Sequence, residues 1–302
     1  MEPKKVVLVI GNGFDLDLGF KTKYSDFAKS TEWKKMFAKE AGRSQHYSLL
    51  KYLNDRKDID NWFDIEQALF EYAHIKTKDV WIHNLETDKR EFLIICDTFR
   101  QYLENHIYSC GHSFSDSFSA KILRCFQRNS ELRKIYTFNY TPLDLIVSNL
   151  GLLHPLEVVH IHGSTKEHNM ILGFETNTNS SIIQGYDFLL KTNQASYHHT
   201  QMQYDMTDAD EVVVFGHSLN MIDSVLFEDY LQNLTQPICK ERRLTIITSD
   251  YISQQLILYN IRQMQVSVPK LFSYARLEFI WTSKMTKIMK EGAERLLKRI
   301  EI

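Results

Sequence analysis

The sequence predicts an α/β protein with a doubly wound parallel sheet and an inserted helical subdomain. A continuous apolar, mostly β-branched run at residues 6–10 ends directly at Gly11, as a strand buried on both faces of a parallel sheet does. From residue 131 onward, further apolar runs alternate with helical patterns, which is typical of a doubly wound sheet. Residues 24–130 between them carry apolar side chains at three- and four-residue spacing, which indicates helices.

The first strand is expected at residues 6–10, at the centre of the sheet. In the helical block that follows, Trp62, Ile65, Leu69 and Tyr72 share one helical face and are expected to pack on neighbouring helices. The later strands are predicted at residues 134–138, 157–161, 211–215, 244–248 and 277–281, and the intervening helices at 142–150, 222–234, 253–264 and 283–299.

Composition excludes several classes of protein. The 302 residues are 43% hydrophobic, 25% charged and 12% aromatic, with 11 Gly and 5 Pro, so the chain is neither disordered nor collagen-like. The formal charge of -2 excludes a basic footprint for nucleic acid over the whole surface, although a local patch stays open.

The cysteines and the N-terminal segment indicate a reduced, cytoplasmic protein. Cys96, Cys110, Cys125 and Cys239 form no CxxC pair, so no structural zinc site is expected and the four are read as small core residues. The N-terminal segment has no secretory pattern, and no apolar run approaches the roughly 18 to 20 residues that cross a bilayer.

Polar or glycine-rich segments follow four of the predicted strands. Because ligands of open α/β sheets bind at the carboxyl ends of the strands, these segments are the expected site. They are Gly11-Asn12-Gly13-Phe14-Asp15, Asn139-Tyr140-Thr141, His162-Gly163-Ser164 and Gly216-His217-Ser218.

The glycine turn is suited to a phosphate, since its backbone N–H groups precede a helix. Leu16 stands where the third glycine of a dinucleotide-binding fingerprint belongs, and no acidic strand end follows about 20 residues later, which disfavours an ordinary NAD(P) dehydrogenase. A plain turn between strand and helix stays open. Asp15 either caps the helix or contacts a ribose hydroxyl.

Two side chains in these segments are suited to catalysis. Asn139 can hydrogen-bond a sugar hydroxyl or a water, or merely satisfy its turn, and His162 can act as a general base near neutral pH. His160 lies on the same strand face as His162, but a third metal ligand is lacking and a structural role is preferred. His217 is either a turn residue or a ligand contact.

Together, these segments resemble the AbiH family of bacteriophage abortive-infection proteins between about residues 6 and 260. More distantly, they are similar to sirtuin-like NAD-binding domains. The segments that carry the resemblance are LVIGNGFDL at 8–16, KYSDF at 23–27, WFDIE at 62–66, TFNYT at 137–141, IHG at 161–163, ILGF at 171–174 and VFGHSL at 214–219.

The resemblance implies a Rossmann-like, sirtuin-like nucleotide-binding domain at residues 1–23 and 131–302, with 24–130 inserted. It implies Asn139 and His162 as catalytic residues. The residues it implies for nucleotide binding are Gly11, Asn12, Gly13, Asp15, Gly216, His217 and Ser218. No cysteine module matches the zinc site of deacetylating sirtuins, so the implied reaction is hydrolysis of NAD+ to nicotinamide and ADP-ribose, with NAD as substrate.

Three functional classes stay open: an NAD-consuming defence effector, a nucleotide-sensing module without turnover, and a nuclease-type toxin. The expected partner is NAD or a related nucleotide, and a phage-derived trigger and a second copy of the chain stay open as further partners. The helical insertion is expected to cover the nucleotide site. Asp64 or Glu66 would then either reach that site or lie on a solvated helix face.

Overall fold

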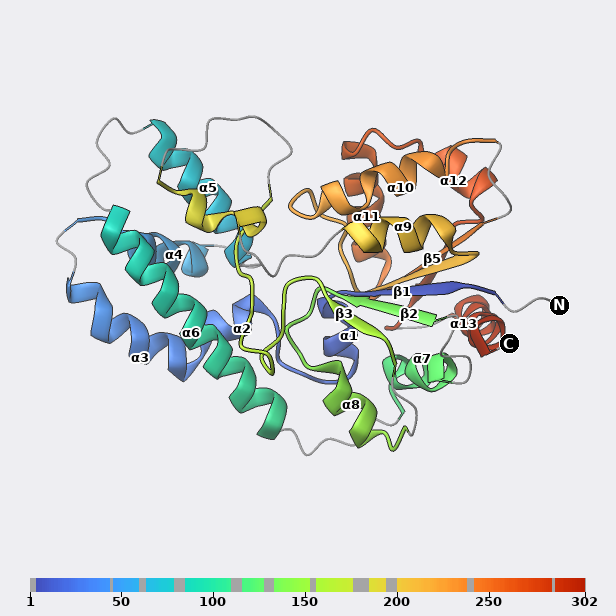
Figure 1. Ribbon diagram of the computed structural model, residues 1–302, viewed down its shortest axis with the longest axis horizontal. Coiled ribbons are helices and arrows are strands. Elements are labelled where there is room, and N and C mark those ends of the chain that lie inside the picture. Colours follow the sequence, from blue (N-terminus) through green and yellow to red (C-terminus); the bar gives the residue numbers. More distant parts are fainter. Residues whose placement is uncertain are drawn as a thin grey trace. The chain divides into compact units, whose positions relative to one another are not determined.

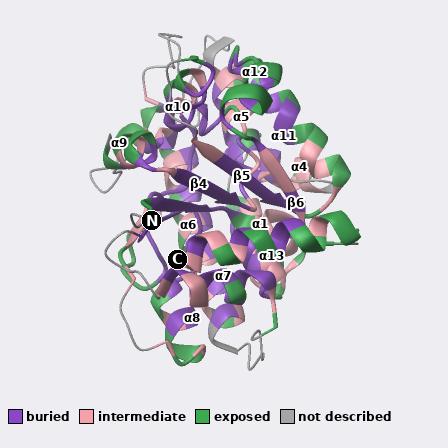
Figure 2. Cartoon of the chain, turned by 90° about the vertical axis from the view of Figure 1, so that its right-hand side faces the viewer, coloured by how far each residue is buried: buried purple, intermediate pink, exposed green. Residues whose placement is uncertain are grey.

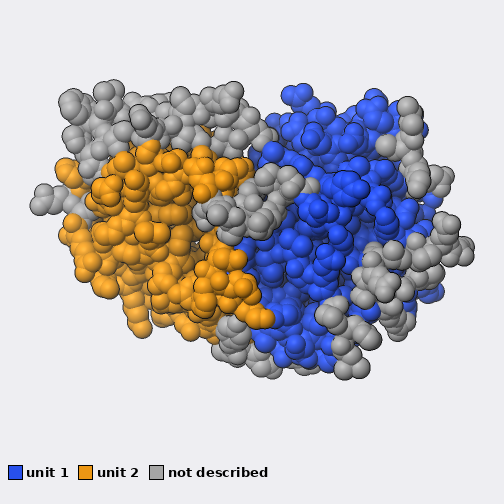
Figure 3. Space-filling model, in the orientation of Figure 1, with its two compact units in different colours: residues 1–20, 112–164, 198–302 blue, residues 21–111, 165–197 orange. Residues whose placement is uncertain are grey.

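The computed structural model describes residues 4–43, 46–59, 64–78, 85–109, 116–127, 133–152, 156–175, 185–193, 200–237, 242–283 and 286–301. The chain divides into two compact units (Figure 3). The first contains residues 1–20, 112–164 and 198–302, and the second contains 21–111 and 165–197. The sequence predicts a single inserted segment, whereas two separate segments build the second unit.

A six-stranded, all-parallel sheet forms the core of the first unit (Figure 1). Its strand order is β3-β2-β1-β4-β5-β6, so β1 lies at the centre, between β2 and β4, as predicted. Each predicted strand is confirmed to within one residue at either end. The strands are β1 (Val6–Ile10), β2 (Arg133–Thr137), β3 (Val158–His160), β4 (Glu211–Phe215), β5 (Arg243–Thr248) and β6 (Glu278–Trp281).

Helices cover both faces of this sheet (Figures 1 and 2). One face carries α9 (Thr200–Asp208), α10 (Glu228–Asn233), α11 (Tyr251–Gln263) and α12 (Val268–Tyr274). The other carries α1 (Asn12–Asp17), α7 (Phe118–Gln127), α8 (Leu143–Asn149) and α13 (Lys287–Glu301). This doubly wound, Rossmann-like arrangement explains the apolar run of β1, because every residue of that strand is buried.

The helix predicted at 222–234 is interrupted. A short 3-10 helix, η5 (Ser224–Leu226), precedes α10, and Phe227 joins the two. The predictions at 142–150, 253–264 and 283–299 correspond to α8, α11 and α13, although α13 begins four residues later than expected.

The second unit is mainly helical. It contains α2 (Tyr24–Lys29), α3 (Thr31–Glu40), α4 (Leu49–Ile59), α5 (Ile65–Lys78) and α6 (Leu85–Ser109), with 3-10 turns η1 (Ala41–Arg43), η3 (Asp187–Leu189) and η4 (Lys191–Asn193). The predicted apolar stripe is confirmed for Ile65, Leu69 and Tyr72, which are buried, and the Tyr72 ring packs on Tyr52 of α4. Trp62 lies outside the described residues.

Helix α6 spans 25 residues, yet its sequence alternates apolar with charged side chains. Across the described ranges, no helix combines the length and the apolar character needed to cross a membrane.

Candidate functional site

The chain reverses its direction of winding between β1 and β4. From β1 the connections run outward through β2 and β3, and from β4 they run the opposite way through β5 and β6. In open α/β sheets, the loops at the carboxyl ends of the two strands beside such a reversal hold the ligand. The residues predicted from the sequence follow β1, β2, β3 and β4, so the topology gathers them at this edge of the sheet.

The glycines after β1 and β4 let two backbones touch. The Gly11 N–H donates to the carbonyl oxygen of Phe215, and the Gly13 N–H donates to that of Gly216, each at 2.9 Å. A Cβ atom on Gly13 would lie 2.6 Å from the Gly216 Cα, and one on Gly11 would lie 2.6 Å from the His217 Cα. Close backbone packing therefore requires glycine here, and two of the N–H groups expected to face phosphate already donate within the protein.

A carboxylate cluster, defined as Asp15, Asn139 and Thr141, lies beside the glycine turn. The Thr141 Oγ1 donates to the Asp15 Oδ2 at 2.5 Å, and the Asn139 Nδ2 donates to the Gly11 carbonyl oxygen at 3.1 Å. Asp15 lies inside α1, and no side chain caps that helix, so the interpretation of Asp15 as a helix cap is wrong. Its carboxylate instead ties α1 to the loop after β2.

Asp15 is an acid held out of water. It is 2% exposed, and burial raises its pKa from 3.8 to about 6, while hydrogen bonds from Thr141 and Asn139 pull the pKa down. At neutral pH the folded protein therefore carries a carboxylate that would be more stable in water.

This raised pKa predicts a pH-dependent stability. Between pH 4 and pH 6 the folded protein keeps a proton on Asp15 that the unfolded chain has released, so stability falls as the pH rises. In urea titrations, the unfolding free energy of wild type minus that of Asp15→Asn should drop by about 2 kcal/mol across this range.

Thr141→Val is the companion variant for that experiment. It removes a hydrogen bond that lowers the pKa of Asp15, so the drop should move to higher pH. A difference between wild type and Asp15→Asn that stays constant with pH would contradict the assignment.

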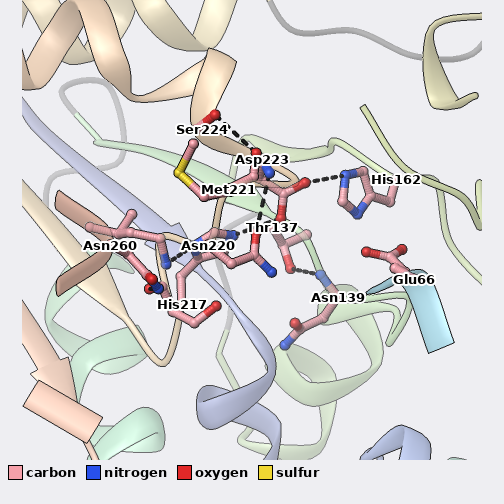
Figure 4. Close-up of polar contacts among 12 residues, drawn as sticks. Glu66, Thr137, Asn139, His162, His217, Asn220, Met221, Asp223, Ser224 and Asn260 are labelled. Carbon is pink, nitrogen blue, oxygen red and sulfur yellow. Dashed lines mark hydrogen bonds and ion pairs between the residues drawn. The ribbon is translucent and has the colours of Figure 1, made fainter. Parts of the chain in front are cut away.

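A histidine cluster, defined as His162, His217 and Asp223, lies at the ends of β3 and β4. The Asp223 Oδ1 is 3.5 Å from the His162 Nε2, and its Oδ2 is 3.4 Å from the His217 Nε2. Figure 4 shows the Asp223 carboxylate directed toward the His162 ring. One buried carboxylate thus faces both predicted histidines.

Aromatic rings surround the histidine cluster. The Phe138 ring centroid is 4.3 Å from that of His217 and 5.1 Å from that of His162, and Phe227 packs on His217 at 5.0 Å. These apolar walls exclude water, which strengthens the electrostatic interaction between Asp223 and the two rings.

The hydrogen bonds divide the predicted residues between the two clusters. Asn139 hydrogen-bonds Asp15 in the carboxylate cluster, whereas the preceding residue, Phe138, packs on the histidine cluster. Consecutive residues of an extended chain point to opposite sides, which accounts for this division. The prediction that Asn139 and His162 are the catalytic residues stays a prediction.

Two further predicted residues, Asn12 and Ser218, are more exposed than the members of the two clusters. Asn12 is exposed at the start of α1, and Ser218 is half-buried, with its carbonyl oxygen accepting from the Asn260 Nδ2 at 2.9 Å. His160 places its Nδ1 3.2 Å from the Asn139 carbonyl oxygen. This contact fits the structural role preferred for His160.

Asp223 and Thr141 complete the clusters, and the sequence did not identify either as a site residue. The helix predicted from residue 222 includes Asp223, but Asp223 precedes η5 and its N–H donates to the Asn220 Oδ1 at 3.2 Å. One sequence signal could have identified Asp223 as a site residue. It is an acid three residues after Asn220, in the loop that begins with Gly216-His217 at the end of a strand.

Two acids of the second unit have structural partners there. The Asp64 Oδ1 accepts from the N–H groups of Glu66 and Gln67 and so caps α5. The Glu66 Oε2 accepts from the buried Lys191 Nζ at 3.0 Å. A role for either acid toward a nucleotide stays a prediction.

Within the described part of the chain, no group of three or more His, Cys, Asp and Glu side chains is arranged to hold a metal ion. The histidine cluster is not such a group, and its Asp223 carboxylate faces the two rings, one with each oxygen.

Comparison with known proteins identifies the family. No curated protein matches the sequence. The family model for bacteriophage abortive infection AbiH matches residues 7–248, a range that includes both clusters and the strand ends that position them. The similarity to sirtuin-like domains rests only on the short segments quoted from the sequence. The match covers most of the 302 residues, so the chain belongs to the bacteriophage abortive infection AbiH family.

Proposed function

We propose that this chain is an abortive-infection effector that hydrolyses NAD+ to nicotinamide and ADP-ribose at the carboxyl edge of its sheet. Membership of the AbiH family supports the general role in bacteriophage abortive infection, without specifying a reaction. The observation that best supports the reaction is a histidine, His162, held against the buried carboxylate of Asp223, which lies in the loop after β4, a strand beside the reversal of the sheet.

The proposed reaction breaks the bond between C1′ of the ribose and the nicotinamide nitrogen. The bonding electron pair leaves with nicotinamide, which departs neutral, and C1′ becomes oxocarbenium-like. A water oxygen then bonds to C1′ and gives its proton to His162, an assistance typically worth about 10²- to 10⁴-fold. Asn139 orients this water or a ribose hydroxyl.

The nucleotide-binding assignments follow the same edge of the sheet. Gly11, Asn12, Gly13 and Asp15 are proposed to lie toward the phosphates and ribose, and the adenosine side falls to Gly216, His217 and Ser218. Because the Gly11 and Gly13 N–H groups donate to backbone carbonyls, phosphate binding depends on other groups of this turn, of which Asn12 is exposed.

A second candidate is nucleotide binding without turnover. His162 is 3% exposed and His217 is 6% exposed, so both rings are largely withdrawn from solvent. Such burial favours a structural or sensing role for these histidines, and only a turnover measurement separates it from catalysis.

The test is to incubate the purified full chain with NAD+, with and without lysate from phage-infected cells, and to quantify nicotinamide by chromatography. Wild type should release nicotinamide. His162→Gln, whose amide can still donate to Asp223, and Asn139→Ala should each lose about 10²-fold or more of that release. His168→Ala, a change at an exposed histidine of the second unit, is the matched control and should keep wild-type release.

Each other outcome has a defined meaning. Binding of NAD+ by wild type without any release would replace the proposal with the sensing module. Cleavage of added RNA or DNA with NAD+ left intact would replace it with the nuclease-type toxin. Full release by both site variants would remove Asn139 and His162 from the catalytic assignment.

A further inference from the structure

We infer that Asp223 is a positioning residue whose single carboxylate orients both histidines and keeps the His162 proton on Nε2, leaving the His162 Nδ1 as the base. The catalytic part of this inference rests on the proposed function. The positional part depends only on the geometry of the histidine cluster.

The loop after β4 determines which ring nitrogen of neutral His217 carries the proton. Its Nδ1 accepts a hydrogen bond from the Leu219 N–H at 3.0 Å. A neutral imidazole that accepts at Nδ1 carries its proton on Nε2, and this is the nitrogen that faces the Asp223 Oδ2. The backbone thus presents the N–H of His217 to the carboxylate.

The same loop holds Asp223 in place. Gly216 and Leu219 adopt left-handed backbone conformations, with φ of 68° and 49°, which fold the loop back on itself. The Asn220 Oδ1 accepts from the Asp223 N–H at 3.2 Å. His217 and Asp223 are therefore fixed relative to each other by a few residues of one turn.

His162 approaches the other carboxylate oxygen from β3. Its Nε2 lies 3.5 Å from Oδ1, so each oxygen of Asp223 serves one ring. An ionised carboxylate only accepts hydrogen bonds, which favours a proton on the His162 Nε2 and leaves a lone pair on Nδ1. The carboxylate thus orients the ring from one nitrogen, and the other nitrogen is left to accept a proton as a general base.

The two distances between the Asp223 oxygens and the histidine Nε2 atoms are long enough to shorten when a substrate binds. Both exceed the roughly 2.7–3.2 Å of an N–H···O hydrogen bond, so the contact in this state is mainly electrostatic. Catalytic hydrogen bonds are often long before substrate binds and shorten in the complex. The aromatic walls formed by Phe138 and Phe227 keep water from competing for the carboxylate.

The positional part is tested by long-range ¹H–¹⁵N correlation spectra of the full chain labelled at histidine nitrogen. Loss of one ring's signals in His162→Gln assigns them. In wild type, neutral His162 should show its proton on Nε2 and an unprotonated Nδ1. A wild-type spectrum with the proton on Nδ1 would overturn the inference without any variant at Asp223.

Asp223→Asn then tests the cause. Its amide can donate as well as accept, so the His162 signals should shift toward the other tautomer, and nicotinamide release should fall by about 10²- to 10⁴-fold. Asp223→Glu retains a carboxylate and should retain the wild-type tautomer. Asp229→Asn, at an exposed acid of α10, is the control for a lost charge and should change neither readout.

The two readouts separate the two hypotheses. A wild-type tautomer that persists in Asp223→Asn, with the chain folded, overturns the positioning role whether or not NAD+ is hydrolysed. The expected spectra combined with no nicotinamide release by wild type would overturn the proposed function and leave the positioning role of Asp223 in place.

Discussion

Gly216→Ala should destabilise the first unit by about 2–5 kcal/mol. The added Cβ would lie 2.4 Å from the Phe14 nitrogen and 2.5 Å from two Gly13 atoms, all of them backbone. Its φ of 68° adds about 1–2 kcal/mol of strain for an L-residue, and overpacking adds about 1–3 kcal/mol or more. Urea unfolding followed by circular dichroism measures the loss.

Gly19→Ala is the matched control for that measurement. Gly19 also has a positive φ, 90°, but a Cβ there would meet no atom within 4 Å. It should cost only the strain of about 1–2 kcal/mol. Equal costs for Gly216→Ala and Gly19→Ala would show that the close approach of the β1 and β4 loops is not what requires glycine.

Lys191→Met should destabilise the second unit by about 3–5 kcal/mol. The Lys191 side chain is fully buried and its Nζ lies 3.0 Å from the Glu66 Oε2, so removing the ammonium takes a cationic partner away from a buried carboxylate. The double variant Lys191→Met/Glu66→Gln should recover most of the loss, because it removes both charges. Thermal or urea unfolding of the three proteins gives the comparison.

An exposed ion pair serves as the control for that prediction. Lys89 and Glu86 lie 3.6 Å apart on α6, with side chains 39% and 89% exposed. Lys89→Met should cost no more than about 1 kcal/mol, because water screens this pair. A similar small cost for Lys191→Met would contradict the assignment of the buried pair as a stabilising contact.

The strands could be predicted because their pattern is local. A strand buried on both faces must be apolar at every position, as residues 6–10 and 211–215 are, and such runs are legible in any short window of sequence. It was harder to predict from the sequence which segments of the chain build the second unit. Residues 171–174 and 185–193 pack with helices that precede them by 100 residues or so, and no local pattern reports that pairing.

The sequence predicted where the site histidines lie, but it did not predict the carboxylate that contacts them. Strand ends located His162 and His217, because parallel strands bring their carboxyl ends to one edge. The carboxylate between them comes from a loop whose shape depends on two left-handed residues, Gly216 and Leu219, and a left-handed leucine has no sequence signature. Gly11 and Gly13 are predicted to face a phosphate, and the structure shows that each of them allows the close approach of a second backbone.

The pairing of β1 has a consequence for biosynthesis. Val6 pairs with Arg133 on one side and with Glu211 on the other, so the first strand made is completed by the partner that emerges last of the three. At roughly 5–20 residues per second, a separation of about 205 residues corresponds to roughly 10–40 s in which this apolar strand lacks its second neighbour. Assembly dominated by such distant contacts is slow and leaves a β-branched edge exposed to aggregation. We therefore expect the yield of native protein to depend on chaperones that shield the newly made β1 segment.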